Sequence, residues 1–324
     1  MVLLCCGLMA ACSANKDPQF PIEETIVQEL MPLQGVTNPL LVNVEYPYLI
    51  LENLDRVDSI YHIYDIRNHE LKSVFGIVGR GPGEFSGYTR LLHTPLEDIL
   101  VLDINENIIF RYGIDKGGLP VPKGSIQAKF SGYLIDPVFI SDSLYAFDAD
   151  SNLEIRSLYD ELPRKSRPYR NPDILDPDFD PNMGFVYANA NCIAFCYGYK
   201  KQIDFMDTEL NLIKSVKFEY APPANVESGR QWDTKLSYIN SYFGKRYCYN
   251  LFVGASMNEY KLPSFRGALL EVFDLEGNPV AKYHLDGITP ECFAIDEENF
   301  TLYGLLETSD LEDQLLVYKL RGLS

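Results

Sequence analysis

The sequence predicts an all-β protein, a six-bladed β-propeller with four-stranded antiparallel blades, from three observations. Short alternating apolar and polar runs, separated by turn residues, fill the 324-residue chain, and helical periodicity is scarce. A hairpin made of an apolar or aromatic strand, an Asp and a polar turn recurs along the chain, and a matching strand precedes each copy. The recurring aspartates are Asp65, Asp115, Asp160, Asp207 and Asp274.

The spacing of this repeat fits propeller blades. Successive Asp positions differ by 50, 45, 47 and 67 residues, and Tyr318 in the last strand of this kind follows Asp274 by 44 residues. A period of this length, with one insertion, is typical of four-stranded blades. Two β-sandwich domains would explain the alternation but not a single period. The matching upstream strands number six, at residues 48–53, 98–104, 142–149, 192–199, 247–254 and 300–307.

One further segment, residues 24–33 (ETIVQELMPL), is left over from the six units and alternates in part as a strand. Small blades cannot bury both faces alone, so they stack radially around a channel and leave only short edges. We therefore expect residues 24–33 to close the ring by pairing with the last strand, at residues 315–320.

The sharpest motif, VFGIVGRGPGEFSGY, spans residues 74–88. Its glycine spacing does not fit a dinucleotide loop, and no helix pattern follows it to hold a phosphate. Glycines permit a tight crossing between blades, and Pro82 stiffens the turn. Arg80 and Glu84 either pair or bond the backbone in this crossing, or they contact a ligand.

The same motif carries a resemblance to a known family. The strand DILVLDINENIIFRYGID, residues 98–115, and the glycine motif before it resemble the NHL-type and TolB-like six-bladed propellers. The GxGPGEF form is similar to that of propeller lipoproteins of Gram-negative gut bacteria. Asp103 and Asn107 match the Asp and Asn that order the hairpin of the NHL blade. The resemblance covers about one blade and implies a propeller, a lipid anchor and, for most members, no established activity. The matching motif residues are Gly76, Gly79, Gly81, Pro82, Gly83, Glu84 and Phe85.

The start of the chain reads as an export signal. Residues 1–11 (MVLLCCGLMAA) are apolar, uncharged, too short to span a bilayer as a helix, and end in small residues before Cys12. This stretch resembles the lipobox of bacterial lipoproteins, in which the Cys is lipidated. We expect a signal peptide at 1–11, a tether at 12–22 and one propeller domain at 23–324, with a buried apolar N-terminus as the alternative. The predicted location is the cell envelope, as an outer-membrane lipoprotein facing the periplasm or the cell surface.

The net charge of the chain limits the kinds of partner that it can bind. The chain carries 28 Lys and Arg against 46 Asp and Glu, a formal net charge of −18. Nucleic acid is excluded as a partner, because affinity for its backbone comes mainly from Lys and Arg. The expected partners are a lipid membrane, through acylated Cys12, and an unknown envelope protein, glycan or peptide.

A long insertion in the fifth unit, residues 221–260, is a candidate binding site. Long loops on a rigid scaffold often carry function. An exposed Trp232 could stack on a sugar ring or anchor a protein partner, with Arg230 and Tyr238 adding polar contacts. Alternatively, the tyrosines of this segment belong to strands and pack in the core.

Metal and cofactor signals are weak. The spacing of Asp148, Asp150 and Asn152 is similar to that of ligands in a calcium-binding loop, but Leu153 stands where such a loop has its turn glycine. The acidic loop NPDILDPDFDPN, residues 171–182, could attract a divalent cation, whereas such carboxylates are usually solvated. The basic run PRKSRPYR before it, residues 163–170, could fold back on this loop or capture a carboxylated ligand. We predict no cofactor, with a divalent cation as the alternative.

The cysteines are predicted to be free thiols. Cys192 and Cys196 lie four residues apart on a predicted strand, which places their Cα atoms about 13 Å apart, too far for a disulfide. No His-rich segment accompanies them to form a zinc site. Buried thiols on packed strands are the better interpretation.

Catalytic motifs are missing from the sequence. It contains no GxSxG or HExxH, and its four histidines are scattered. We therefore predict a non-catalytic ligand- or protein-binding or assembly module. The alternative is a metal-dependent hydrolase or lyase with its site in the central channel, since scattered residues can converge there.

Overall fold

The computed structural model describes most of the chain. The described residues are 17–33, 35–36, 38–53, 59–79, 81, 84–94, 97–130, 132, 134, 136–149, 152–174, 176–220, 226, 230–306 and 313–324. Several residues discussed above, namely 1–16 with Cys12, Arg80, Pro82, Gly83 and Asp150, lie outside them.

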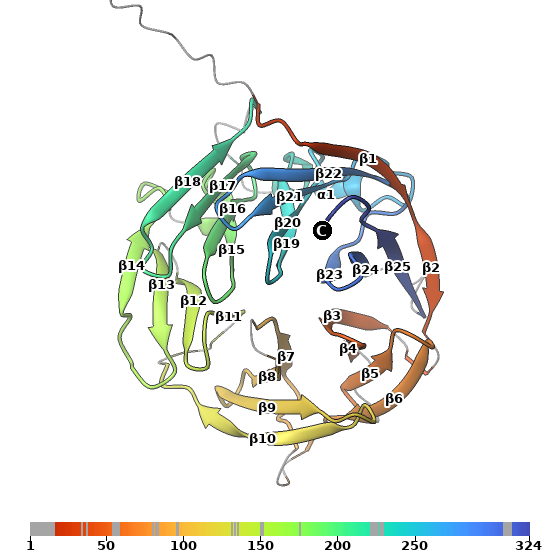
Figure 1. The fold of residues 1–324 in the computed structure, drawn as a ribbon. Helices are drawn as coiled ribbons and strands as arrows, with labels where there is room; N and C mark the ends of the chain where they lie inside the picture. Colours follow the sequence, from red (N-terminus) through yellow and green to blue (C-terminus); the bar gives the residue numbers. More distant parts are fainter. Residues whose placement is uncertain are drawn as a thin grey trace, which may run out of the picture.

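Six sheets, each with four antiparallel strands, surround a central axis, which confirms the predicted six-bladed propeller (Figure 1). Each blade begins with its innermost strand and ends at the outer edge. Blade 1 contains β3 (Pro39–Glu45), β4 (Tyr48–Asn53), β5 (Tyr61–Asp65) and β6 (Glu70–Phe75). Blade 2 contains β7 (Thr89–Leu92), β8 (Ile99–Asp103), β9 (Ile108–Ile114) and β10 (Pro120–Gln127). Blade 3 contains β11 (Val138–Phe139), β12 (Leu144–Ala149), β13 (Asn152–Ser157) and β14 (Lys165–Pro168).

The other three blades follow the same order. Blade 4 contains β15 (Gly184–Ala188), β16 (Ile193–Tyr197), β17 (Gln202–Met206) and β18 (Leu212–Lys217). Blade 5 contains β19 (Tyr238–Phe243), β20 (Tyr247–Phe252), β21 (Leu269–Asp274) and β22 (Pro279–Asp286). Blade 6 contains β23 (Cys292–Asp296), β24 (Thr301–Leu305) and β25 (Gln314–Lys319). The described helical turns are η1 (Pro177–Phe179), η2 (Gln231–Asp233) and α1 (Met257–Tyr260). None of them is long and apolar enough to cross a bilayer.

The N-terminal segment closes the ring as predicted. Strand β2 (Glu29–Pro32) is the outer strand of blade 6 and runs antiparallel to β25, with Met31 opposite Leu315. Strand β1 (Ile22–Val27), which precedes it, adds a fifth strand to blade 5 and runs parallel to β22, with Ile22 opposite Ala281. The sequence predicted the first of these pairings. For residues 24–27 the expected pairing with the last strand is wrong, because they belong to β1 and pair with β22.

The recurring Asp has a local structural cause. In three blades its Oδ1 accepts hydrogen bonds from the backbone N–H groups two and four residues further on, which folds the turn between the third and fourth strands. The distances are 2.8 and 2.8 Å at Asp115, 2.9 and 2.9 Å at Asp207, and 3.0 and 2.7 Å at Asp274. At Asp160 an ion pair with Arg164, 3.0 Å long, replaces this pattern.

The core lies between neighbouring blades, where the second strands of blades 1, 2, 4 and 6 are packed on both faces. Every residue of β4, β8, β16 and β24 is buried. Cys192, Cys196 and Cys248 are buried free thiols, as expected, and Cys292 is a half-buried one. Burial raises the pKa of the Cys192 thiol to about 12.

Candidate functional site

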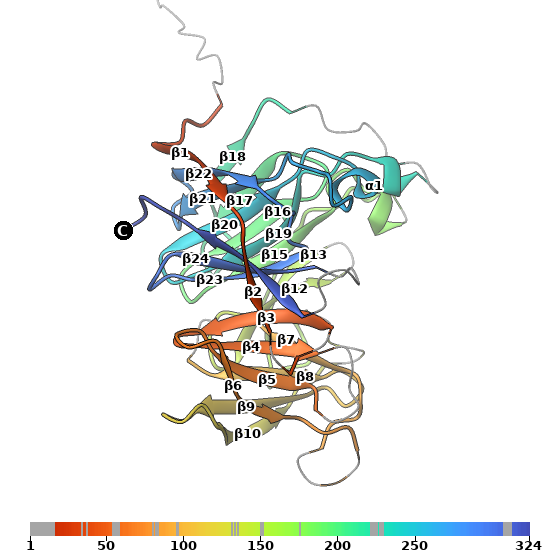
Figure 2. The same cartoon turned by 90° about the vertical axis from the view of Figure 1, so that its right-hand side faces the viewer.

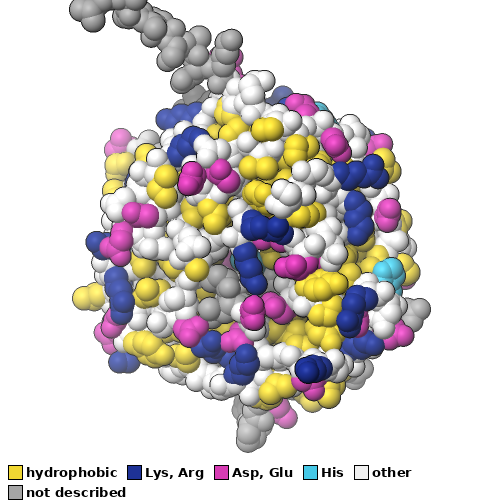
Figure 3. All heavy atoms as spheres, viewed as in Figure 1, with side chains coloured by type: hydrophobic (Ala, Val, Ile, Leu, Met, Phe, Trp, Pro, Cys, Tyr) yellow, Lys and Arg dark blue, Asp and Glu magenta, His cyan; other side chains and the backbone are white. Residues whose placement is uncertain are grey.

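A cavity of about 690 Å³ opens at one end of the channel, where the first strand of each blade turns into the second. We call it the mouth cavity. Hairpins of five blades line it, and both signs of charge gather around the centre of this face (Figure 3). Figure 2 shows the ring from its side, with α1 on the opposite face from the C-terminus. The lining side chains with polar groups are Glu45, Tyr46, His93, Thr94, Glu97, Asn189, Asn191, Tyr242, Lys245, Arg246, Asp296, Glu297 and Glu298.

A contact between opposite blades forms the floor of the mouth cavity. His93, just after β7 in blade 2, donates its Nε2 proton to the carbonyl oxygen of Phe243 in blade 5, at 2.7 Å. The imidazole ring lies 4.6 Å from the ring of Tyr242, centroid to centroid. Its Nδ1 lies 3.4 Å from Oδ1 of Asn43. Burial lowers the pKa of His93, so the imidazole is neutral near pH 7. The channel is thus divided in two.

The far side of this floor is a second cavity of about 580 Å³, the inner cavity, and both cavities are lined by His93 and Tyr242. Arg90 crosses its wall and pairs with Asp136 through two hydrogen bonds, of 2.6 and 3.1 Å. Phe185 and Cys292 face the same space. Burial raises the pKa of the Cys292 thiol.

Two carboxylates of the mouth cavity hold the backbone of its rim. Glu297 accepts hydrogen bonds from the N–H groups of Lys245, Arg246 and Tyr247, at 2.7, 3.1 and 3.2 Å. It also accepts one from the Tyr249 hydroxyl, at 3.0 Å. Asp296 is buried and closes its own turn by accepting the N–H of Glu298, at 2.9 Å. Both carboxylates therefore have a structural role, because their hydrogen bonds stabilise the hairpins of blades 5 and 6.

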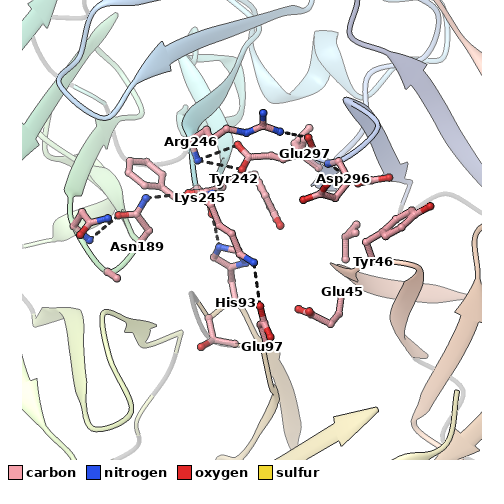
Figure 4. A pocket seen from close by; sticks show the side chains of 18 residues that line it. Glu45, Tyr46, His93, Glu97, Asn189, Tyr242, Lys245, Arg246, Asp296 and Glu297 are labelled. Carbon is pink, nitrogen blue, oxygen red and sulfur yellow. Dashed lines mark hydrogen bonds and ion pairs between the residues drawn. The ribbon is translucent and has the colours of Figure 1, made fainter. Parts of the chain in front are cut away.

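Glu45 is different from these acids. It ends β3 and is half-buried, and among the described residues no side chain or backbone group donates a hydrogen bond to its carboxylate. Burial raises the pKa of Glu45; nearby Lys245 opposes the shift and nearby Glu97 adds to it. In Figure 4 the Glu45 and Tyr242 side chains point into the cavity from blades 1 and 5.

Glu97 and Lys245 complete the rim. The Lys245 ammonium reaches across the mouth from blade 5 to Glu97 in blade 2, with 3.5 Å between Nζ and Oε1. Both side chains are largely exposed, so this ion pair adds little stability. The contact can open without cost to the fold.

The residues predicted from the fifth unit do not form one site. Trp232 lies in η2 with 52% of its surface exposed, and Arg230 precedes it. Tyr238 is instead 1% exposed in β19, where its hydroxyl donates to Glu271 Oε2 at 2.7 Å. Its position corresponds to the core alternative, and its hydroxyl is not available to a ligand.

The glycine motif forms a tight crossing between blades 1 and 2. The Glu84 carboxylate accepts the N–H of Gly81 at 2.6 Å, and a Cβ at Gly79 would collide with it. Gly76 has a φ of +80°, and a Cβ there would lie 2.9 Å from the ring of buried Phe85. Glu84 therefore has a backbone role, while its partner candidate Arg80 lies outside the described residues.

Residues of the acidic loop and of the basic run make hydrogen bonds and ion pairs within the protein. Asp180 of the acidic loop is buried and accepts the N–H groups of Asn171 and Asn182, at 2.7 and 2.8 Å. In the basic run, Lys165 pairs with Glu209 at 2.9 Å, and Arg170 with Asp148 at 3.4 Å. Across the described part of the chain, no three His, Cys, Asp or Glu side chains are placed to hold a metal ion.

Sequence reasoning missed the residues of the mouth cavity. Tyr242 lies within residues 221–260, the candidate segment of the fifth unit. Glu45 and His93 come from two other blades and belong to no motif. The only signal for them is positional, since each lies at or near the end of a first strand. That end faces the axis in every blade.

The sheets and their arrangement around one axis define a six-bladed β-propeller. Residues 201–298 match the family model described as TolB-like 6-blade propeller-like. The matched segment runs from blade 4 into blade 6 and does not include residues 74–115, on which the sequence resemblance rested.

Two solved structures share the fold over nearly the whole chain. A member of the DUF4221 family from Bacteroides vulgatus has a TM-score of 0.58 at 13% identity, with 90% of this chain and 95% of that chain covered. A protein of Bacteroides fragilis described as exported has a TM-score of 0.53 at 13% identity, with 92% and 97% covered. At this identity the likeness concerns the fold alone. A comparison with curated proteins finds no match.

Proposed function

We propose that this chain is a lipid-anchored propeller of the cell envelope that acts as a non-catalytic binding module, with its ligand in the mouth cavity. The observation that carries the proposal is the floor made by His93 and Phe243, which turns an open channel into a cup with one mouth. Its volume of about 690 Å³ is within the usual range for small-molecule sites. Hairpins from five blades give this cup rigid walls.

The chemistry of the cavity supports binding over catalysis. His93 is the one histidine among the described lining residues, and its Nε2 proton is held by the Phe243 carbonyl. Asp296 and Glu297 are committed to backbone N–H groups. The metal-dependent alternative would need three convergent ligands, and no such group occurs in the described ranges.

The anchor would hold the ring by its outer edge. Asp17, the first described residue, accepts the N–H of Glu219 at 2.6 Å, after the end of β18. Asp17 follows Cys12 by five positions, so the edge would lie within about 20 Å of the acyl chains. The fold shared with a Bacteroides fragilis protein described as exported supports an envelope location. The ligand would come from an envelope protein, a glycan or a peptide.

Ligand capture by cavity variants tests the binding role. Asn191→Trp places an indole on an exposed hairpin tip at the mouth, and Glu276→Trp places one on an exposed turn of the outer edge. The proteins are incubated with an envelope extract, gel-filtered and analysed for bound small molecules by mass spectrometry. We expect the same bound mass in wild type and Glu276→Trp, and none in Asn191→Trp. A bound mass retained by Asn191→Trp, or none in any protein, would contradict the proposal.

A further inference from the structure

We infer that the mouth cavity binds its ligand through a primary ammonium group, with Glu45 as the counter-ion and Tyr242 as the aromatic wall. The inference rests on the proposed function, because it names the chemistry of the ligand in the same cavity. The supporting observation is that Glu45, whose carboxylate accepts no hydrogen bond from the described residues, and Tyr242 line the same cavity.

The charges of the cavity leave an excess of negative charge. Within the described chain, five carboxylates and two cationic side chains line it. Lys245 faces Glu97, and Arg246 donates to the Glu297 carbonyl and lies over the Phe300 ring, 4.6 Å from its centroid. Neither cation is directed at Glu45 by a hydrogen bond. An anionic ligand would therefore be repelled, and a cationic one attracted.

Glu45 lacks what a half-buried carboxylate normally has. Its oxygens are not among the buried side-chain atoms that lack a hydrogen-bond partner, so water reaches them and a donor group of a ligand can replace that water. Neighbouring Asp98, by contrast, is held by Arg111 at 2.7 Å and by Lys123. A ligand ammonium supplies three N–H donors, which Glu45 lacks, and a positive charge closer to the carboxylate than that of Lys245, which makes no hydrogen bond to it.

Two tyrosines line the same cavity as this carboxylate. Tyr242 projects into the cavity opposite Glu45, and Tyr46 follows Glu45 in the rim (Figure 4). The faces of such rings attract cations. The Tyr242 hydroxyl also makes no hydrogen bond to the described residues, so it is available to a polar group of the ligand. Carboxylate and aromatic rings together favour an ammonium over a neutral amide or hydroxyl.

Two pairs of probes test the ammonium and distinguish its sources. Glucosamine and N-acetylglucosamine represent a glycan, and a Gly-Lys-Gly peptide with blocked ends and its Nε-acetyl form represent a protein. Binding is measured by calorimetry at low ionic strength. We expect at least one amine to bind, and its acetylated partner to bind about tenfold more weakly or worse. The pair that shows this difference identifies the source.

Matched variants test the counter-ion. Glu45→Gln and Glu298→Gln each remove one negative charge from the same lining, but Glu298 is exposed. We expect Glu45→Gln to weaken amine binding about tenfold or more, and Glu298→Gln less than about threefold. Glu45→Asp, which keeps the charge but withdraws it by one methylene, should lie between them. Urea unfolding should show Glu45→Gln to be at least as stable as wild type, because a costly buried carboxylate is gone.

Failure of this inference differs from failure of the proposed function. Equal binding of acetylated and free probes, or equal affinities of Glu45→Gln and Glu298→Gln, would overturn the ammonium. The same holds if no amine binds to wild type. The cavity would still be the binding site if Asn191→Trp alone lost the mass captured from the envelope extract.

Discussion

His93 connects two hairpins that are 150 residues apart in sequence and opposite each other in the ring. Its hydrogen bond to the Phe243 carbonyl and its contact with Tyr242 hold blades 2 and 5 at a fixed separation. Because burial lowers the pKa of His93, the folded state resists the proton that would charge it. The floor of the cavity should therefore be sensitive to acid.

Substitution of His93 by Phe tests this connection. His93→Phe keeps a ring beside Tyr242 but removes the donor, so we expect the free energy of unfolding to fall by about 1–3 kcal/mol at pH 7. His284→Phe is the control, since His284 is exposed and pairs with Glu23 at the surface. That variant should lose less than about 1 kcal/mol. Urea unfolding monitored by fluorescence gives both values.

The same variant should flatten the pH dependence of stability. A histidine with a lowered folded-state pKa binds its proton first in the unfolded chain, so stability is lost as pH falls below about 6.5. Wild type should lose more stability than His93→Phe between pH 7 and pH 5. A residual slope is expected in the variant, because burial also lowers the pKa of His62. Identical slopes in both proteins would show that His93 is not the group responsible.

At the residue scale, the sequence could not point to the site. Trp232 and Arg230 stand out in a long insertion, whereas Glu45 looks like any polar residue before a turn. The property that distinguishes Glu45 is the missing hydrogen bond, which depends on groups from other blades. Tyr238 is the opposite case. Its position in an insertion suggests a surface residue that could contact a ligand, but in the structure its side chain is buried.

The blades could be predicted from the sequence because the pattern that marks each blade depends only on residues close together in the chain. An Asp that bonds the N–H groups two and four residues ahead needs no distant partner, and so it recurs with the period of the fold. The parallel pairing of β1 with β22 leaves no such pattern, since Ile22 and Ala281 are far apart in the chain. Closure by β2 could be predicted because blade 6 lacked a fourth strand.

Neighbouring residues of β2 test how much the closing strand contributes. Met31 is 4% exposed and packs in the core between blades 6 and 1, whereas Leu30 is 48% exposed. Met31→Asp should lower the free energy of unfolding by about 3 kcal/mol or more, because it buries an unpaired charge and leaves a cavity. Leu30→Asp, one position away on the opposite face, should cost less than about 1 kcal/mol. Equal losses in thermal and urea unfolding would mean that β2 is not packed as described.

On the scale of the whole molecule, the chain joins the ring at its outer edge and not at its mouth. Phe20 packs against Phe273 of blade 5 with 5.4 Å between ring centroids, and the Lys282 ammonium lies over the Phe20 ring, 5.6 Å from its centroid. These contacts place the start of the propeller well away from the mouth cavity (Figure 1). An anchor at Cys12 would therefore leave the cavity open.

Removal of the predicted acylation site tests the anchor. In cells fed radiolabelled palmitate, the wild-type chain should be labelled and sediment with membranes. Cys12→Ser should carry no label and appear in the soluble fraction, since acyl chains supply the anchorage. Cys292→Ser is a matched control, because it removes a thiol from within the propeller and should leave the label and the membrane fraction unchanged. A Cys12→Ser chain that still sediments with membranes would rule out this anchor.

Ring closure by β1 and β2 has a consequence for biosynthesis. Of the described strands, β1 and β2 are synthesised first and pair last, since their partners β22 and β25 come from blades 5 and 6. Contacts of such long range form slowly, and until then blades 5 and 6 expose unpaired edges. An exported chain that closes its ring in this way cannot complete its fold before its C-terminal strands have crossed the membrane. In an exported chain, the order of synthesis and the topology would together delay folding until translocation is complete.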